Sequence, residues 1–303
     1  MILERIKYKL LLNIFNKKKK LLWTLVNKLF NNLLSAPTIS VLNLSTNTTL
    51  GKKNEKVFVT NDSYQTWYIM NDTNFHKQLI DKVKEITDND KNYTFIDIGA
   101  NTGLLTKALL NSSKNIHQSY LIEPDKDNFF CLQHNLHKYE NIHAFNFALD
   151  IKEGEKKLFI DKNNKGNLSF NYEMMTLKSD KLNFMNSVDN YEIVKCKSVN
   201  NFFNEINNEN NLIIKIDVQG YDEIIFQEIP ENILKNTKML FIEITPLKSK
   251  EFDIEKLKYK LKIFSEIINF NGETFTYKNV IDYSNSNKEA VDFILINKNC
   301  SKN

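Results

Sequence analysis

Hydrophobic and polar positions follow a strand–helix rhythm along most of the chain from Tyr93 onward. Short, nearly continuous apolar runs alternate with stretches in which apolar residues recur every three or four positions. The runs are typical of buried parallel strands, and the stretches between them are typical of helices that cover a sheet. The expected strands are 93–99, 119–124, 142–149, 211–218, 238–244, 273–281 and 290–298, and residues 156–161 are strand-like. The expected helices are 104–112, 125–139, 198–206, 222–234 and 253–267.

This rhythm predicts an α/β, Rossmann-like fold built from βαβ units around a seven-stranded, mostly parallel sheet. The last two expected strands have only a short polar connection, so they must pair antiparallel. Ahead of the sheet, residues 56–62 and 65–71 resemble a hairpin, and residues 74–86 resemble a helix. Residues 161–189 form a polar insertion with Phe170, Tyr172, Met174 and Met175, and we expect it to cover the site as a lid.

The first 36 residues differ from the rest of the chain. Apolar residues at helical spacing lie on either side of the lysine run 17–20, which predicts a basic amphipathic helical extension. Lysine and asparagine interrupt it too often for a membrane span. It could lie on an anionic membrane surface, or pack on the domain or on a partner subunit. Residues 37–54 read as a linker, and residues 55–303 as the main domain.

Composition excludes only a few classes of protein and of binding site. The hydrophobic share is 42% and the net charge is +4, ordinary for a globular protein and too small for a surface that coats nucleic acid. Cys131, Cys196 and Cys300 have no paired spacing, which argues against disulfides and against a zinc site. We therefore expect no metal site and a cytoplasmic protein, with contact to the inner face of the membrane if the extension binds lipid.

The first expected strand ends in the turn FIDIGANTG, residues 95–103, which holds two of only seven glycines in the chain. Glycines there let a ligand approach backbone N–H groups at the carboxyl edge of the sheet. The turn is not the GxGxxG of NAD enzymes, because Asn101 occupies its centre. Asp97 would repel a pyrophosphate and attract a cation. This combination suits S-adenosylmethionine, which carries an ammonium and a sulfonium. Of the functions considered, an NAD-dependent oxidoreductase is therefore the least favoured.

Glu123 ends the next expected strand, where an acid can accept hydrogen bonds from a ribose diol. NAD and S-adenosylmethionine both have such a diol, so Glu123 alone does not separate them. The seven strands with an antiparallel terminal pair favour the methyltransferase arrangement. The simpler alternative is that Asp97 and Glu123 only cap the helices that follow them.

Four segments, with FIEI on a later strand, carry a family resemblance. They are FIDIGANTG, LIEPDKDNFFCLQHNL, NFALDIKEGEKKLFI and IIKIDVQGYDEIIFQEI. In this order and spacing they resemble the FkbM-type family of S-adenosylmethionine-dependent methyltransferases, from about Tyr93 to the C-terminus. The resemblance implies a class I methyltransferase fold and methyl transfer to a hydroxyl, often on a sugar or a polyketide-like product.

The resemblance also assigns site residues. The positions that match the family's first cofactor loop are Asp97, Gly99, Asn101 and Gly103. Glu123 matches its ribose-binding acid, and Ala148 matches the third-strand end that lies along the adenine edge. The family's fourth-strand motif commonly reads KIDVEG, and here it reads KIDVQG, with Gln219 in place of glutamate. Glutamine keeps the acceptor oxygen but loses the charge, so we give more weight to Asp217 than to Gln219.

Asp217 is our candidate for the catalytic residue, because it follows the strand whose end should face the methyl group. It would orient or deprotonate the acceptor hydroxyl. Lys215 is expected to be structural or an ion-pair partner. Glu243 could line the acceptor pocket or cap a helix. Tyr64, Trp67 and Tyr68 could stack on a ligand, although core packing is the simpler reading.

The predicted function is an S-adenosylmethionine-dependent O-methyltransferase acting on a small-molecule or glycan hydroxyl, with a sugar hydroxyl favoured. Two alternatives remain. One is an RNA ribose methyltransferase, which would need a basic groove that the sequence does not indicate. The other is a non-catalytic binding or scaffold protein on the same fold.

Overall fold

The computed structural model describes residues 39–44, 46–60, 76–89, 91–160, 168–171, 191–206, 210–245, 251–286 and 290–300. The predicted N-terminal extension, the aromatic residues at 64, 67 and 68, and most of the polar insertion lie outside the described residues. In the described part of the chain no helix is long and apolar enough to cross a membrane. Membrane-surface contact by residues 1–36 therefore stays a prediction.

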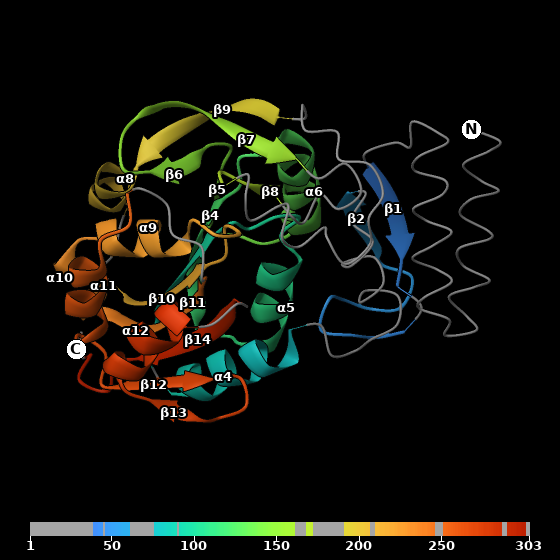
Figure 1. The fold of residues 1–303 in the computed structure, drawn as a ribbon. Helices are drawn as coiled ribbons and strands as arrows, with labels where there is room; N and C mark the ends of the chain where they lie inside the picture. The colour runs from blue at the N-terminus through green and yellow to red at the C-terminus, as the bar shows by residue number, and fades with distance from the viewer. Residues whose placement is uncertain are drawn as a thin grey trace.

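A mixed eight-stranded sheet forms the centre of the molecule (Figure 1). Its strands, in spatial order, are β13 (Thr274–Phe275), β12 (Glu266–Asn269), β14 (Val291–Ile296), β11 (Thr237–Ile244), β10 (Asn211–Ile216), β3 (Tyr93–Ile98), β4 (Ile116–Ile122) and β5 (Ile142–Phe145). The five strands from β11 to β5 are parallel to one another. β14 pairs antiparallel with β11 and β12. The expected pairing of residues 273–281 with the last strand is not found, because only Thr274–Phe275 of that range is strand and it pairs with β12.

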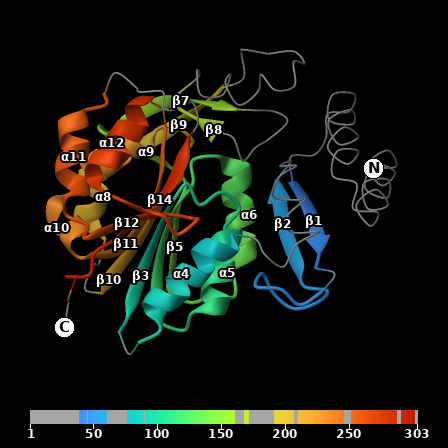
Figure 2. The same cartoon turned by 60° about the horizontal axis from the view of Figure 1, so that its bottom comes forward.

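Two layers of helices cover this sheet, one on each face (Figure 2). One layer contains α4 (Lys77–Thr87), α5 (Leu104–Ser112) and α6 (Lys126–Leu136). The other contains α8 (Val199–Glu205), α9 (Asp222–Glu228), α10 (Glu231–Lys235), α11 (Ile254–Leu261) and α12 (Tyr277–Ser286). Every residue of β3 and β10 is buried because both faces of these strands are covered. The α/β class is therefore confirmed, with a mixed sheet whose five central and edge strands from β11 to β5 are parallel.

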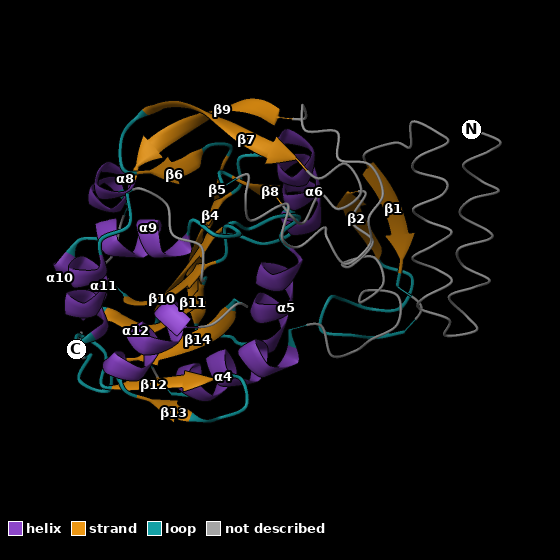
Figure 3. Ribbon diagram, in the orientation of Figure 1, coloured by secondary structure: helices purple, strands orange, loops and turns teal. Residues whose placement is uncertain are grey.

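A second sheet of four strands lies across one end of the first (Figure 3). Its order is β6 (Ala148–Asp150), β9 (Tyr191–Ser198), β7 (Gly154–Ile160) and β8 (Leu168–Ser169). Its inner face is a small apolar cluster that includes Ala148, Leu158, Val194 and Cys196. We call these four strands the cap sheet.

A two-stranded antiparallel ribbon packs on the side of α6 that faces away from the central sheet. Its strands are β1 (Ile39–Asn43) and β2 (Lys56–Thr60). The Asn135 side chain of α6 holds it, accepting from the Phe58 N–H at 2.8 Å and donating to the Phe58 carbonyl at 2.8 Å. The partner of β2 is thus a strand inside the predicted linker 37–54. The expected second hairpin arm, 65–71, lies outside the described residues.

The structure corrects several expected elements. The central sheet has eight strands rather than seven, because β12 forms where the expected helix 253–267 was to end. The helix expected at 253–267 ends at Leu261, and β12 follows; the strand expected at 273–281 is mostly helix α12. The expected strand 142–149 divides between the two sheets, and β9 was not expected at all.

Candidate cofactor and acceptor site

A pocket lies between the carboxyl ends of the central strands and the cap sheet. It has an empty volume of about 570 Å³, part of which is open to solvent. The central sheet and its turns line it with Ile98, Gly99, Asn101, Ile122, Glu123, Pro124, Asp217, Val218, Gln219 and Tyr221. The other lining residues are Asn128, Ala148, Leu149, Leu158, Leu168 and Phe170. The site is therefore where ligands bind in open α/β sheets.

The glycines of the first turn allow two close approaches. Gly99 has a φ of +80°, and a Cβ there would lie 2.0 Å from the backbone oxygen of Asp217. Gly103 has a φ of +74° and precedes α5, and a Cβ there would lie 3.1 Å from Leu132 and Leu136 of α6. Gly99 thus lets the turns after β3 and β10 touch, while Gly103 lets α5 and α6 pack closely.

Asn101 and Glu123 join the first turn to the end of β4. Asn101 has a left-handed φ of 50°, and its backbone N–H donates to Glu123 Oε2 at 2.8 Å. The Asp125 N–H donates to Glu123 Oε1 at 2.9 Å, and the Asn128 side chain also hydrogen-bonds the carboxyl group. Each carboxylate oxygen has lone pairs left, so Glu123 can still accept bonds from a ribose diol.

Burial dominates the electrostatics of Glu123, whose residue is only 3% exposed. Burial, with the nearby Asp125 charge, raises the pKa of the Glu123 carboxyl to about 8, although the hydrogen bonds it accepts lower it. The carboxyl group is thus mainly protonated at neutral pH until a ligand supplies further donors. Hydroxyl donors from a bound ribose would favour the charged form.

Asp97 does not line the pocket, contrary to the expectation that it attracts a cationic ligand directly. It is fully buried: Oδ1 lies 2.9 Å from Lys215 Nζ, and Oδ2 accepts from the Thr106 hydroxyl at 2.8 Å. Burial alone would lower the pKa of the Lys215 ammonium, but the carboxylates of Asp97 and Asp217 outweigh it and raise that pKa. Lys215 also donates to the Gly99 carbonyl at 3.0 Å. Asp97 and Lys215 therefore support the turn from beneath, and the ion-pair prediction for Lys215 is confirmed.

Asp217 lies in the pocket wall, directly after β10, and its side chain is 30% exposed. Its Oδ1 accepts from the Gln219 side-chain amide at 2.7 Å, and its Oδ2 lies 3.7 Å from Lys215 Nζ. Gln219 has a left-handed φ of 56°. The amide of Gln219 thus serves as a donor to Asp217, a role that an ionised glutamate could not fill.

Asp222, which the sequence reading missed, shapes the turn after β10. Its carboxylate accepts from the backbone N–H groups of Val218 at 3.1 Å and Gly220 at 3.0 Å. Burial and the neighbouring charge of Glu243 raise the pKa of Asp222 well above its usual value. An acid two residues after a glycine was the available sequence signal. Its role is to close the turn that presents Asp217.

A polar network joins the cap sheet to the same turn. The Tyr221 hydroxyl donates to Asp150 Oδ1 at 2.6 Å, and Lys156 Nζ lies 3.0 Å from Asp150 Oδ2. Lys156 Nζ also donates to the Tyr221 hydroxyl at 2.9 Å, and the Ser169 hydroxyl donates to the Gln219 carbonyl at 2.6 Å. Burial and the bond to Asp150 raise the pKa of the Tyr221 hydroxyl. The network fixes the cap sheet over the pocket.

The last two predicted site residues have different positions. Ala148 lines the pocket as expected, but from β6 of the cap sheet rather than from the third central strand. Glu243 lies near the end of β11 and is not among the pocket-lining residues. Its charge acts on Asp222 instead, so its link to the pocket is indirect.

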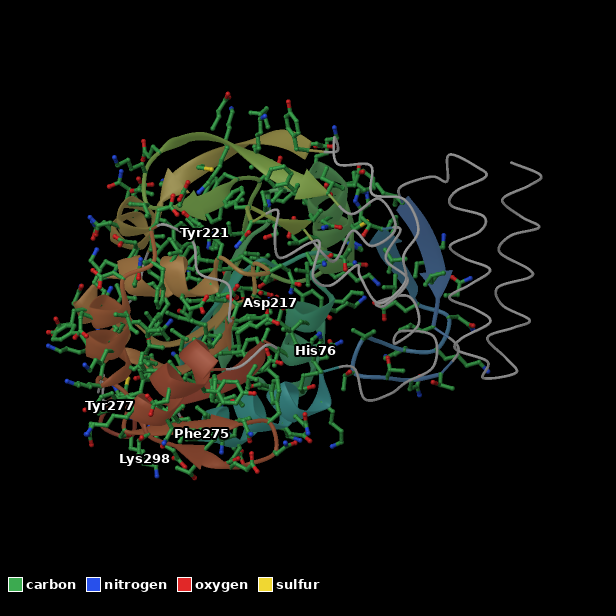
Figure 4. All side chains as sticks on the ribbon, in the orientation of Figure 1. His76, Asp217, Tyr221, Phe275, Tyr277 and Lys298 are labelled. Atoms are coloured by element: carbon green, nitrogen blue, oxygen red, sulfur yellow. The ribbon has the colours of Figure 1, made fainter. Side chains whose placement is uncertain are left out.

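His76, the residue before α4, is exposed and is not among the residues that line the pocket. Desolvation lowers the pKa of its imidazole to about 4; Asp217 opposes the shift and Lys215 adds to it. Figure 4 labels His76 and Asp217. The sequence reading placed His76 inside the helix expected at 74–86, whereas α4 begins one residue after it.

The fold and pocket define a Rossmann-like α/β protein with a ligand site at the carboxyl edge of its sheet. Family comparison then identifies the chain: the FkbM methyltransferase domain matches residues 97–288, well over half of the sequence. The chain therefore belongs to the FkbM methyltransferase family. No curated protein matches it.

Similar solved structures are distant. An FkbM methyltransferase from Methylobacillus flagellatus KT has 15% identity and a TM-score of 0.40; the match covers 67% of this chain and 43% of that one. A precorrin-6y C5,15-methyltransferase from Geobacter metallireducens GS-15 has 8% identity, coverage of 73% and 88%, and a TM-score of 0.32. The plantazolicin methyltransferase BpumL, in complex with SAH, has 9% identity, coverage of 73% and 84%, and a TM-score of 0.31. This chain thus spans less than half the length of the Methylobacillus protein.

The family implies S-adenosylmethionine, and the pocket residues fit it. Asn101 Oδ1 is buried and has no hydrogen-bond partner among the described residues, so it can accept from an ammonium group. Glu123 can accept from a ribose diol, and Ile122, Leu149 and Leu158 supply an apolar wall for an adenine ring. The opposite end of the pocket ends at Asp217 and Gln219.

Proposed function

We propose that the protein is an S-adenosylmethionine-dependent O-methyltransferase whose acceptor is a hydroxyl of a small molecule or glycan, with a sugar hydroxyl favoured. One observation carries the proposal. A single pocket joins Asn101 and Glu123, which suit the cofactor, to Asp217 and Gln219, which suit a hydroxyl group. Methyl transfer needs this juxtaposition because the acceptor oxygen must lie in line with the sulfur–methyl bond.

When bound, S-adenosylmethionine supplies a methyl group activated by its sulfonium charge. The residues of the chain provide the rest. Glu123 and Asn101 fix the cofactor in one orientation at the first turn. Asp217 accepts a hydrogen bond from the acceptor hydroxyl, which orients the oxygen toward the methyl position. The cap sheet, held by Tyr221 and Asp150, closes over the pocket and limits the entry of water.

The walls of the pocket favour a sugar. Phe170 presents an aromatic ring there, edge-to-face with Tyr221 at a centroid distance of 5.5 Å. Asp217 and Gln219 supply a carboxylate and an amide within the same wall. An aromatic ring can pack against the C–H face of a sugar, while carboxylate and amide groups bind hydroxyls.

Isothermal titration followed by a transfer assay tests the proposal. The full chain is titrated with S-adenosylmethionine, and tritiated cofactor is then offered with monosaccharides, methyl glycosides and total RNA as separate probes. We expect binding, and label in a sugar fraction. Absence of binding by a folded protein would favour the scaffold alternative, and label in RNA would favour the ribose alternative. Either result would overturn the proposal.

Asp217→Asn separates binding from chemistry in the same assay. The amide keeps the size of the side chain but loses the charge that orients a donating hydroxyl. We expect the affinity for S-adenosylmethionine to stay within about twofold and transfer to fall about 10²–10⁴-fold. Transfer close to that of the wild type would remove Asp217 from the reaction.

A further inference from the structure

We propose that Gln219 is a positioning residue for the methyl transfer, whose side-chain amide holds the Asp217 carboxylate in the orientation that receives the acceptor hydroxyl. This inference rests on the proposed function, because it concerns the same reaction. It adds a separate task for the residue that stands where the family motif commonly has glutamate. Asp217 meets the hydroxyl, and Gln219 acts through Asp217.

The first step is the direction of the Gln219 amide. Its Nε2 lies 2.7 Å from Asp217 Oδ1, within hydrogen-bond distance. A carboxylate only accepts hydrogen bonds, so the end of the amide that faces it must be the N–H end. Turned by half a rotation, the amide would bring two oxygens to this distance with no hydrogen between them. The amide therefore fixes one lone pair of the carboxylate, and a hydroxyl can approach another.

The second step is the backbone of Gln219, which the neighbouring turn holds on both sides. Its φ of 56° is left-handed, and Gly220 follows with a φ of 93°. The Asp222 carboxylate accepts from the N–H groups of Val218 at 3.1 Å and of Gly220 at 3.0 Å. Left-handed conformations of residues other than glycine cost free energy and are found preferentially at functional sites. This one directs the Gln219 side chain back to Asp217.

The third step is the carbonyl of Gln219, which the cap sheet holds. The Ser169 hydroxyl donates to it at 2.6 Å, and Ser169 is only 1% exposed. The Ser169 oxygen accepts from the Asn171 N–H at 2.9 Å, so its own hydrogen can point at the carbonyl. The position of the amide is therefore set by the cap sheet as well as by the turn. Gln219 thus connects the cap sheet to the carboxylate that meets the acceptor.

The fourth step is the set of charged groups around Asp217. β10 supplies Lys215, whose Nζ lies 3.7 Å from Asp217 Oδ2 and 2.9 Å from Asp97 Oδ1 of β3. The other titrating groups of this cluster come from three further elements: Asp222 of α9, Glu243 of β11 and His76 ahead of α4. Several carboxyl groups are already present, so another negative charge at position 219 would be unfavourable. A neutral amide stabilises the Asp217 charge without adding one.

The charge of Asp217 matters because of the proton that the transfer releases. The acceptor oxygen gains the methyl group, its proton passes to the Asp217 carboxylate, and the electron pair of the sulfur–methyl bond stays on sulfur. One positive and one negative charge disappear together, so atoms and charge balance. Asp217 must therefore enter the step ionised and with a lone pair directed at the hydroxyl. The hydrogen bond from Gln219 favours both conditions.

A glutamate at this position would behave differently. Two carboxylates are not stable 2.7 Å apart unless they share a proton. With one shared proton, the pair would still present a donor to Asp217, as the amide does. Once that proton is lost at higher pH, the donor is lost and the two charges repel. Glutamine thus makes the position of Asp217 independent of pH in a range where glutamate would not.

Gln219→Glu and Gln219→Met test this role, with transfer from tritiated S-adenosylmethionine to methyl glycosides measured from about pH 6 to about pH 9. Methionine has a similar length but no donor. Gln219→Met should therefore lose about 10–100-fold in transfer at every pH, as expected for one hydrogen bond to a charged group. Gln219→Glu should stay within about threefold of the wild type at low pH and fall toward Gln219→Met at high pH. Both variants should bind the cofactor within about twofold of the wild type, because Asn101 and Glu123 are unchanged.

Gln133, an exposed glutamine of α6, supplies the matched controls Gln133→Glu and Gln133→Met. Both should keep the wild-type transfer at every pH. A Gln219→Met variant with wild-type transfer would overturn the inference. So would a Gln219→Glu variant whose ratio to the wild type does not change with pH, because a purely structural role predicts a constant ratio.

An NMR titration of the carboxyl groups needs no acceptor. The Asp217 signal is assigned with Asp217→Asn and followed against pH in the wild type and in Gln219→Glu. We expect Asp217 and the introduced carboxyl group to titrate as a coupled pair in two separated steps, and Asp217 of the wild type to lack the second step. Two independent titrations in Gln219→Glu would contradict the inference, since the groups would not be in contact. Absence of cofactor binding by the wild type would instead contradict the proposed function.

Discussion

The turns after β3 and β10 touch each other, and both are built around an aspartate and residues with positive φ. Asp97 stands near the end of β3, just before the first turn with Gly99, and the second turn contains Asp217 and Gln219. They meet where the Asp217 N–H donates to the Ile98 carbonyl at 3.0 Å. Yet the Asp97 side chain is 1% exposed and the Asp217 side chain 30% exposed.

This difference shows that the same residue type has two tasks in neighbouring turns. Asp97 neutralises Lys215 and fixes the backbone of the cofactor turn from below. Asp217 lies farther from the same lysine, at 3.7 Å, and part of its side chain is exposed in the pocket. The buried charge supports structure, and the exposed charge is available for chemistry. The predictions that follow test whether one turn has a structural role and the other a chemical role.

The largest effect should come from Lys215→Met. The substitution leaves the Asp97 carboxylate buried without its cation, which destabilises folded proteins by about 3–5 kcal/mol. Urea unfolding measures the loss. Lys298→Met is the control, because Lys298 is 65% exposed in its pair with Glu266 and should cost less than about 1 kcal/mol. The double variant Asp97→Asn/Lys215→Met should recover part of the loss. Equal losses for both lysines would show that the buried pair has no special role.

Gly99→Ala should have the next largest effect. Its new Cβ would meet the Asp217 oxygen at 2.0 Å and push the turns apart, whereas Gly272, with a φ of +79°, has no atom within 4 Å of such a Cβ. Gly272→Ala therefore measures backbone strain alone, about 1–2 kcal/mol. Gly99→Ala should lose at least about 1–3 kcal/mol more, together with cofactor binding. Similar unfolding free energies in the two variants would argue against contact between the turns.

Glu123 gives a pH-dependent test of the cofactor side. Its raised pKa means that this carboxyl group stabilises the ligand-free fold fully below its usual pKa, and that the contribution is lost as pH rises through about 8. Ribose hydroxyls favour the ionised form, so binding should release a proton. Affinity for S-adenosylmethionine should therefore rise by up to about tenfold per pH unit toward pH 8 and then level off.

Calorimetry in buffers of different ionisation enthalpy measures this release. Glu123→Gln should bind more weakly and show no such rise, because the amide does not titrate. An affinity of the wild type that stays constant across this range would contradict the assignment of Glu123 to the ribose.

Tyr221→Phe should have the smallest effect. It removes the hydroxyl that joins the turn after β10 to Asp150, and Lys156 remains as a partner of that carboxylate. We expect a loss of about 1 kcal/mol in unfolding free energy. Thermal unfolding of the variant beside the wild type measures it. A much larger loss would mean that the cap sheet depends on this single bond.

The sequence predicted the central sheet well because its strands are continuous apolar runs covered on both faces. It predicted the cap sheet poorly. In β9, Val194, Cys196 and Ser198 alternate with more exposed residues, but the long polar insertion ahead of this strand concealed the period. The end of the chain was misread because β-branched and aromatic residues at 273–281 suggested a strand where tertiary packing selects helix α12.

The site likewise has residues that the sequence predicted and contacts that it did not predict. Gly99, Asn101, Glu123 and Ala148 are adjacent to recognisable turns, and the structure brings them into one pocket. Spacing could not show that Asp97 is neutralised by Lys215, since that pair joins residues 118 positions apart.

The most direct test of the central claim is a crystal structure of the protein with S-adenosylhomocysteine. The account predicts both ribose hydroxyls within hydrogen-bond distance of the Glu123 carboxylate, and the sulfur on the side of the pocket that faces Asp217. A ligand bound elsewhere, or bound here with its sulfur turned away from Asp217, would contradict it.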